Sequence, residues 1–434
     1  MEREIDQFLR EWRDRPSRKS LLVRGARQVG KTYSVRRLGR TFDHYVEINF
    51  EETPSAGSVF QGALTPQPIV EWLSAFSRTP IRPGETLLFL DEIQACPKAL
   101  SSLRFFHEKL PDLHVVAAGS LLEFALEEIP SQGVGRIESI FMYPMTFNEV
   151  VKAQGGEGML EFVDRANPDS PLDPAFHRQL TDRMRAYQLT GGLPEVVQTY
   201  VDTGDLNLCM DVLDDLITTF EDDFSKYRAR VPASRLADVF HSIPRQVGGK
   251  FKYSNVDSDS QGREIKAALE LLIKAGLVHR ITHTAARGIP LGAQTNPKRF
   301  KALLFDVGIH QRLLGLDIPA HVVAGEIDLV NKGGVAEAVA GLEHIAHGNP
   351  RRHPMLFYWH RERRGSTAEV DYVIQQNEQV VPVEVKAGST GRMRSMHMFL
   401  DERGLDRGVR VSLENFSRFG KIETCPLYAM RTLS

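Results

Sequence analysis

The stretch Gly25–Thr32 reads GARQVGKT and fits the pattern G-x-x-x-x-G-K-[ST]. An apolar run, Leu21–Val23, precedes it, and a helix-compatible run, Tyr33–Leu38, follows it. In this strand–loop–helix context, a glycine-rich loop cradles phosphate groups with its backbone N–H groups, and the positive end of the next helix assists. The residues expected to line the phosphates are Gly25, Ala26, Arg27, Gln28, Val29, Gly30, Lys31, Thr32 and Tyr33.

Two further acids complete the chemistry expected of this loop. Lys31 would reach the β- and γ-phosphates of ATP, and the Thr32 hydroxyl would be a ligand for Mg²⁺. A later apolar run, Thr86–Leu90, delivers Asp91 and Glu92 at its carboxyl end. We expect Asp91 to hold Mg²⁺ and Glu92 to polarise the attacking water. The alternative is two acids that stabilise a helix N-terminus.

The composition sets limits on the class of protein. The 434-residue chain is 42% hydrophobic and 25% charged, which is ordinary for a soluble protein, and its length predicts two or three domains. A formal net charge of −2 means that any DNA-binding face must be local. Three widely spaced cysteines, no signal peptide and no long apolar run predict a cytoplasmic protein without disulfides, structural zinc or a membrane span.

Short apolar runs alternate with helical patterns through the first third of the chain. The expected strands are 20–24, 45–50, 86–90, 114–118 and 139–143, with helices such as 69–76 and 100–109 between them. Apolar strands joined by helices predict a parallel sheet that is covered on both faces.

Two polar residues beyond the fourth strand are further candidates. Ser120 would either contact the γ-phosphate or the attacking water, or cap the next helix. Arg136 ends the turn Gly133–Arg136 after that helix, where the helix dipole also favours an ordinary surface arginine.

The motifs GARQVGKT, LDEIQ, AAGS and GRI, followed by YPMTFNE at 143–149, resemble those of the AAA-type (AAA+) ATPases of bacteria and archaea that carry a nuclease-like C-terminal domain. The resemblance extends over nearly the whole chain. It implies an α/β fold with a five-stranded core, residues 1–145, followed by a helical lid, residues 146–228. It also implies that Arg136 acts on the nucleotide of a neighbouring subunit in a homo-oligomer, a ring or a dimer.

The middle of the chain, residues 229–325, reads as helix, turn, helix and strand, the layout of a winged helix. Four cations of this segment could contact DNA phosphates, although a purely structural module remains the alternative. They are Lys250, Lys252, Arg263 and Lys266. In the family resembled, the GGLP turn of the lid, residues 191–194, lies near the nucleotide.

Residues 326–434 place acids within apolar strands. Asp371 lies in EVDYVI, and Glu384 and Lys386 lie two apart in VVPVEVK. Residues two apart in a strand point to the same face, so these three form a D…E-x-K constellation. This pattern, together with the order of helices and strands around it, resembles the PD-(D/E)XK restriction-endonuclease-like superfamily.

In that resemblance, Asp371 and Glu384 would bind Mg²⁺, and Lys386 would orient the attacking water or stabilise the transition state. Glu337 matches an extra acid that many members carry. Val370 stands where the superfamily pattern has proline, a frequent variation. The alternative is a buried salt bridge between Lys386 and an acid, in a domain that no longer cuts.

Basic residues gather around this constellation in the sequence. They are Arg351, Arg352, Arg361, Arg363, Arg364, Arg392 and Arg394. They form either a surface for a phosphate backbone or a solvated loop.

Two functions remain in competition. The first is an ATPase that binds and moves DNA and cleaves it as a Mg²⁺-dependent deoxyribonuclease. The second is a nucleotide-dependent assembly switch whose nuclease-like domain binds DNA or a protein partner without cutting. A small-molecule P-loop kinase fits neither the chain length nor the E-x-K unit.

Overall fold

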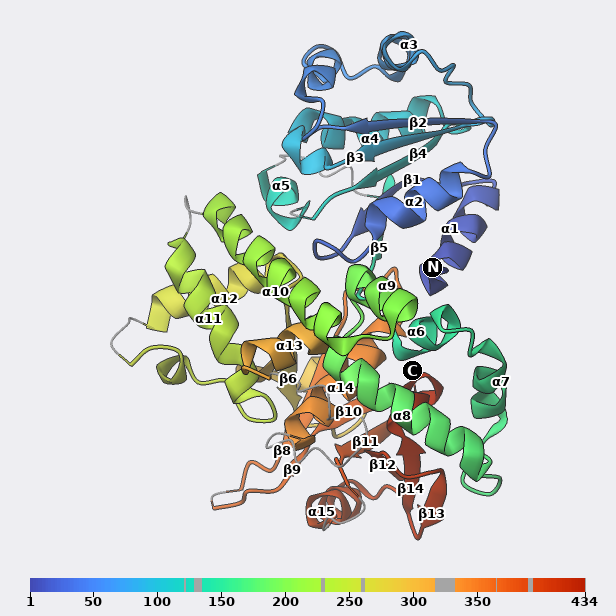
Figure 1. Ribbon diagram of the computed structural model, residues 1–434. Helices are drawn as coiled ribbons and strands as arrows, with labels where there is room; N and C mark the ends of the chain where they lie inside the picture. The colour runs from blue at the N-terminus through green and yellow to red at the C-terminus, as the bar shows by residue number, and fades with distance from the viewer. Residues whose placement is uncertain are drawn as a thin grey trace. The chain divides into compact units, whose positions relative to one another are not determined.

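The computed structural model describes residues 1–120, 122–128, 135–227, 231–258, 262–316, 332–363, 365–388 and 393–433. These residues form two compact units (Figure 1). The first unit comprises Met1–Tyr143 with residues 274–276 and 349–353, and the second comprises the rest. Among the described residues, no helix combines the length and the apolar character needed to cross a membrane.

The first unit is built on a parallel five-stranded sheet in the order β2-β3-β4-β1-β5. Its strands are β1 (Ser20–Arg24), β2 (His44–Asn49), β3 (Thr86–Asp91), β4 (His114–Ala118) and β5 (Ile137–Phe141). The parallel sheet expected from the sequence is confirmed, although β5 begins and ends two residues earlier than predicted. Because all strands run the same way, the segments that follow β1, β3 and β4 meet at one edge of the sheet.

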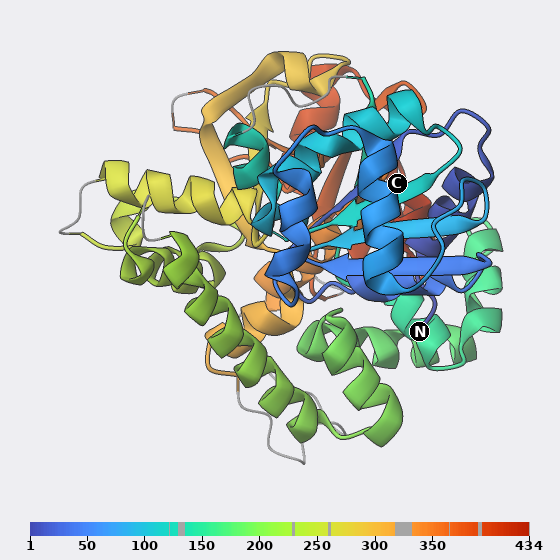
Figure 2. The ribbon, with the colours of Figure 1, turned by 90° about the horizontal axis from the view of Figure 1, so that it is seen from above.

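Helices cover both faces of this sheet (Figure 1). They are α1 (Glu4–Asp14), α2 (Lys31–Gly39), α3 (Pro66–Ser77), α4 (Pro97–Lys109) and α5 (Leu122–Glu128). One buried cluster joins Leu22, Leu88 and Val115 of the strands to Leu73 of α3 and Leu103 of α4. The blue helical segments between β2 and β3 lie over the strands when the molecule is seen from above (Figure 2).

The second unit begins with helices. They are α6 (Phe147–Ala153), α7 (Glu157–Arg165), α8 (Pro174–Thr190), α9 (Pro194–Thr203), α10 (Leu206–Asp223) and α11 (Ala233–Gln246). The later helices are α12 (Gly262–Lys274), α13 (Val307–Leu313), α14 (Lys332–Ala346) and α15 (Arg394–Arg403). Thr146 caps α6 by accepting from Glu149 N while the Glu149 side chain accepts from Thr146 N, which is a capping box.

Two sheets follow, in the orders β7-β6-β8-β9 and β10-β11-β12-β14-β13. The strands are β6 (Val278–Thr284), β7 (Thr295–Leu304), β8 (Leu356–His360), β9 (Glu369–Val370), β10 (Tyr372–Gln376), β11 (Gln379–Val385), β12 (Gly408–Ser412), β13 (Ser417–Phe419) and β14 (Ile422–Pro426). The antiparallel hairpin β6–β7 suits the wing of a winged helix, but β6 also pairs in parallel with β8. The β7-β6-β8-β9 sheet therefore contains strands from residues 229–325 and from residues 326–434, which the sequence predicted as separate domains. The predicted domain boundaries at residues 228 and 325 lie outside the described residues.

The single strand expected at 369–374 is two strands, β9 and β10, because it breaks at Asp371. β9 pairs with β8 and β10 pairs with β11, so the break joins the two sheets. At the break, the Asp371 carboxylate accepts a hydrogen bond from Val385 N at 2.8 Å, in place of a continued strand ladder.

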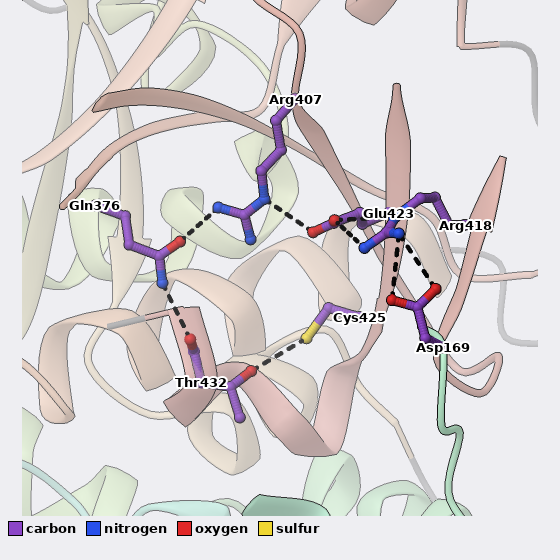
Figure 3. Close-up of polar contacts among 7 residues, drawn as sticks. All are labelled: Asp169, Gln376, Arg407, Arg418, Glu423, Cys425 and Thr432. Carbon is purple, nitrogen blue, oxygen red and sulfur yellow. Dashed lines mark hydrogen bonds and ion pairs between the residues drawn. The ribbon is translucent and has the colours of Figure 1, made fainter. Parts of the chain in front are cut away.

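A polar network links strands β13 and β14 of the β10-β11-β12-β14-β13 sheet to neighbouring segments (Figure 3). Arg407 donates to Glu423 of β14 and to Gln376 of β10, both at 2.8 Å. Arg418 of β13 pairs with Glu423 at 2.9 Å and with Asp169, which lies between α7 and α8, at 3.3 Å. These charge-assisted bonds fix the sheet edge.

Candidate functional site

The loop between β1 and α2 has the backbone geometry of a phosphate cradle. Gly25 and Gly30 have φ angles of +147° and +92°, in the region that side chains disfavour. A Cβ atom on Gly25 would lie 2.2 Å from the Met142 carbonyl oxygen. Only glycine fits this close approach, and the loop thereby folds tightly over the end of β1.

Lys31 opens α2 and is held within the loop. Its Nζ donates to the carbonyl oxygens of Gly25 at 3.0 Å and Ala26 at 2.7 Å. Burial lowers the pKa of Lys31 to about 8, while the carboxylates of Glu92 and Asp91 oppose this shift. The ammonium is thus already positioned beside the backbone N–H groups that would bind phosphate oxygens.

Thr32 and Asp91 lie together as predicted Mg²⁺ ligands. The Thr32 hydroxyl donates to Asp91 Oδ2 at 2.9 Å, and Asp91 Oδ1 accepts from Glu92 N at 3.0 Å. Burial raises the pKa of Asp91, whereas the Thr32 hydrogen bond lowers it. A hydroxyl and a carboxylate beside the loop are hard oxygen donors, so this donor set fits Mg²⁺ bound with a nucleotide.

Glu92 has a strained backbone, with φ +47° and ψ +44° in the left-handed region. Such non-glycine strain is common at functional sites. Gln94 Nε2 donates to Glu92 Oε2 and so holds its carboxylate. Sequence reasoning did not assign Gln94 a role, although it lies within the LDEIQ motif.

Ser120, Arg27 and Tyr33 are the outer residues of the predicted site. Arg27 Nε donates to Ser120 Oγ at 3.1 Å, which joins the loop to the end of β4. Tyr33 is 49% exposed and accepts a hydrogen bond from the amino terminus at 2.9 Å. The cap predicted as the alternative for Ser120 falls on a helix start that lies partly outside the described residues.

Arg136 is half-exposed and pairs with Glu108 of α4. Gly133 and Val134 of the predicted turn lie outside the described residues. An arginine in this exposed position can be reached from outside the chain, but the role across subunits stays a prediction.

The second unit brings Asp371, Glu384 and Lys386 together, at the ends of β9 and β11. Lys386 Nζ lies 2.7 Å from Glu384 Oε1. Burial raises the pKa of Glu384 to about 7; the Asp371 carboxylate adds to the shift, and Lys386 opposes it. Glu384 Oε2 is buried without a hydrogen-bond partner in the described part of the structure.

Sequence reasoning missed the residue at the centre of this cluster, Lys301 of β7. Its Nζ lies 2.9 Å from Glu337 Oε1 and 2.6 Å from Glu369 Oε1. Asp371 Oδ1 is 3.9 Å away. A lysine inside the apolar run Phe300–Leu304 was the available signal, because lysine is almost never buried without partners.

Glu337 and Glu369 do not offer free carboxylates to a divalent metal, because Lys301 engages both. Lys386 engages Glu384 Oε1, whereas Glu384 Oε2 has no hydrogen-bond partner among the described residues and Asp371 Oδ1 lies 3.9 Å from Lys301. Across the described residues, no group of three or more His, Cys, Asp or Glu side chains is arranged to hold a metal ion.

The YPMTFNE stretch and the GGLP turn meet each other in the second unit. Met145 N donates to Gly192 O at 2.6 Å, and Phe147 N donates to Glu343 Oε1 of α14 at 2.9 Å. Asp306, the N-cap of α13, accepts from Gly192 N at 2.8 Å. These two motifs are thus hydrogen-bonded to each other, and each is also hydrogen-bonded to a helix, α14 or α13.

Among the described residues, the basic residues predicted around the C-terminal constellation are divided between the two units. Arg351 belongs to the first unit and pairs with Glu138 at 2.8 Å, whereas Arg361 pairs with Glu402 in the second. Arg352, Arg363 and Arg394 are exposed. Arg364 and Arg392 lie outside the described residues.

Comparison with known families agrees with the first unit. Residues 17–151 match the family described as AAA domain. Together with the five-stranded parallel sheet, this match supports an AAA-type ATPase domain with a P-loop, as the motifs predict. Residues 181–319 and 332–429 match two domains of unknown function, DUF8612 and DUF4143. No curated protein matches the chain.

Several solved structures are similar. The Walker-type ATPase of Pyrococcus abyssi has a TM-score of 0.46 and 17% identity, covering 72% of this chain and 95% of that one. The Aeropyrum pernix ORC1 protein in complex with DNA has a TM-score of 0.30 and 14% identity, covering 73% and 93%. RuvB of Thermotoga maritima has a TM-score of 0.29 and 14% identity, covering 73% and 94%. TM-scores this low do not carry a functional assignment.

Proposed function

We propose that the chain binds ATP with Mg²⁺ at Gly25–Tyr33 and hydrolyses it. The supporting observation is the hydrogen bond between Thr32 and Asp91, because it joins the phosphate loop to the acids after β3. Bound Mg²⁺ would neutralise charge on the β- and γ-phosphates, and Thr32 and Asp91 would hold it. Lys31 would stabilise the same charge, and Glu92 would orient the attacking water.

The test is nucleotide binding and phosphate release by the full chain. Replacement of Lys31 by alanine should reduce hydrolysis by at least about 100-fold, since it removes the buried ammonium beside the γ-phosphate. Lys109→Ala is the matched control, because Lys109 is an exposed lysine of the same unit. Failure of the wild-type protein to bind ATP at millimolar Mg²⁺ would contradict the proposal.

We also propose that hydrolysis takes place in a homo-oligomer, a ring or a dimer, in which Arg136 contacts the nucleotide of the neighbouring subunit. The half-exposed position of Arg136 supports this role. The three cysteines are buried and free, which suits a cytoplasmic location.

DNA is the partner that we propose for the second unit. Lys250, Lys252, Arg263 and Lys266 are all exposed around α11 and α12, and within the described residues no ion pair neutralises them. Unpaired exposed cations are the groups that contact a phosphate backbone. Reversing Lys250 and Lys266 to glutamate should weaken DNA binding in a fluorescence anisotropy titration and reduce its salt dependence. Lys421→Glu, on an exposed lysine that pairs with Asp406, is the control.

For the domain that carries the C-terminal acids, we propose that it binds DNA or a protein partner without cleaving DNA, as part of a nucleotide-dependent switch. The observation that favours it over a Mg²⁺-dependent deoxyribonuclease is the placement of Lys301 among Glu337, Glu369 and Asp371. Plasmid DNA incubated with Mg²⁺ should be cut equally little by the wild-type protein and by Lys386→Ala. Cleavage that only the wild type performs would contradict this choice. The switch also predicts that light scattering shows an ATP-dependent change in oligomer size.

A further inference from the structure

Lys301 is buried among carboxylates that come from distant parts of the sequence. Its side chain is 1% exposed, on β7, while Glu337 lies on α14 and Glu369 on β9. Glu337 and Glu369 each place a carboxylate oxygen within hydrogen-bond distance of Lys301 Nζ, and this pairing favours the charged ammonium.

An aromatic ring completes the surroundings of this ammonium. Lys301 Nζ lies 5.2 Å from the centroid of the Tyr358 ring on β8, a distance suited to a cation–π contact. Two carboxylates within 3 Å and a ring face provide partners for the charged group on several sides. Burying a lysine is costly unless its charge is paired in this way.

We propose that Lys301 is a built-in counter-cation that takes the place of a divalent metal ion in the acidic cluster. A metal ion between Glu337 and Glu369 would need the carboxylate oxygens that face this ammonium. Asp371 Oδ1 lies farther away, at 3.9 Å. Lys386 pairs with Glu384 Oε1 at 2.7 Å, while Glu384 Oε2 has no hydrogen-bond partner among the described residues. The inference is independent of ATP hydrolysis, because every residue that it uses lies in the second unit.

The two lysines affect both the stability of the second unit and its affinity for metal ions. The second unit holds its acids together without a metal ion, since two lysines supply the positive charge. Removing Lys301 leaves the buried Glu337 and the partly exposed Glu369 without their positive partner, so a divalent cation should then become favourable at the same place.

The experiment is a Mn²⁺ titration of the nucleotide-free full chain, followed by electron paramagnetic resonance of free Mn²⁺ and by thermal unfolding. The wild-type protein should show no saturable site and no shift in Tm. Lys301→Met should lower Tm by roughly 10 °C, should bind Mn²⁺ at least about tenfold more tightly, and should regain part of the lost Tm on binding. Adding Glu337→Gln to this variant should abolish the gain in metal binding.

Lys298→Met is the matched control, because Lys298 is an exposed lysine of the same strand. It should leave both Tm and metal binding unchanged. Saturable Mn²⁺ binding by the wild-type protein that Glu384→Gln abolishes would overturn the proposal, and so would a folded Lys301→Met that gains no metal affinity. If Lys301→Met does not fold, the wild-type titration alone decides between these outcomes.

ATP binding measured on the same preparations separates this inference from the proposed function. Lys301→Met should bind ATP as the wild type does, since the nucleotide site lies in the first unit. If the protein binds no ATP but shows the expected Mn²⁺ binding and Tm shifts, the proposed ATPase function is contradicted and the counter-cation proposal is supported.

Discussion

The Thr32 hydroxyl donates a hydrogen bond to the Asp91 carboxylate across 2.9 Å, although 59 positions separate the two residues in the sequence. This bond joins the start of α2 to the end of β3. It holds together the two oxygen donors that would share one Mg²⁺, before any ligand is required to assemble them. The proposed nucleotide site is therefore preorganised by the sheet.

Replacing Glu92 by glutamine should reduce ATP hydrolysis by about 10²–10⁴-fold, because the amide cannot accept a proton from the attacking water. ATP binding should remain close to that of the wild type, since Lys31 and Thr32 are untouched. Steady-state phosphate release and equilibrium binding of a fluorescent ATP analogue measure the two effects. Glu85→Gln, on an exposed acid of the same unit, is the control, and equal loss in both variants would refute the assignment.

Arg136→Ala should abolish most ATP hydrolysis while ATP binding persists, because an arginine supplied across subunits stabilises the transition state by about 10³–10⁵ in rate. Mixing this variant with Lys31→Ala should restore activity, since one protein supplies an intact site and the other an intact arginine. Phosphate release is measured over a range of protein concentrations. Mixtures no more active than the separate variants would exclude action between subunits.

Gly25→Ala should destabilise the first unit by roughly 2–4 kcal/mol, because its Cβ would meet the Met142 carbonyl oxygen at 2.2 Å. Gly158→Ala is the control, as it lies in α7 with open space around it. This control should be neutral or stabilising by about 0.5–1 kcal/mol. Urea denaturation measures both, and equal stability of the two variants would show that the loop tolerates a side chain.

The buried Asp306 should make stability depend on pH. Burial raises the pKa of Asp306 to about 6, although backbone N–H groups of Gly192, Ile309 and Gly308 oppose the shift. The folded state then holds a proton that the unfolded state has lost, so the free energy of unfolding falls as pH rises from 5 to 7. The expected fall is about 1 kcal/mol relative to Asp306→Asn.

Urea titrations at pH 5, 6 and 7 measure this difference. Asp202→Asn, on an exposed helix position, should retain the pH dependence of the wild type. An Asp306→Asn variant whose stability follows the wild type at all three pH values would contradict the role of Asp306.

Local sequence patterns determined much of the first unit. The Gly25–Thr32 loop and the strands 20–24 and 114–118 follow from contiguous residues, because a glycine pattern and an apolar run act over a few positions. The same holds for the pairing of Glu384 with Lys386, which the two-residue period of a strand places on one face.

Only the tertiary structure decided what surrounds the C-terminal acids. Lys301, Glu337 and Glu369 come from β7, α14 and β9, and no local pattern links them. The pairing of β6 with β8 likewise brings together segments predicted as separate domains. Such contacts depend on which faces of distant elements pack together, so the compensation of buried charge becomes visible only when the chain has folded.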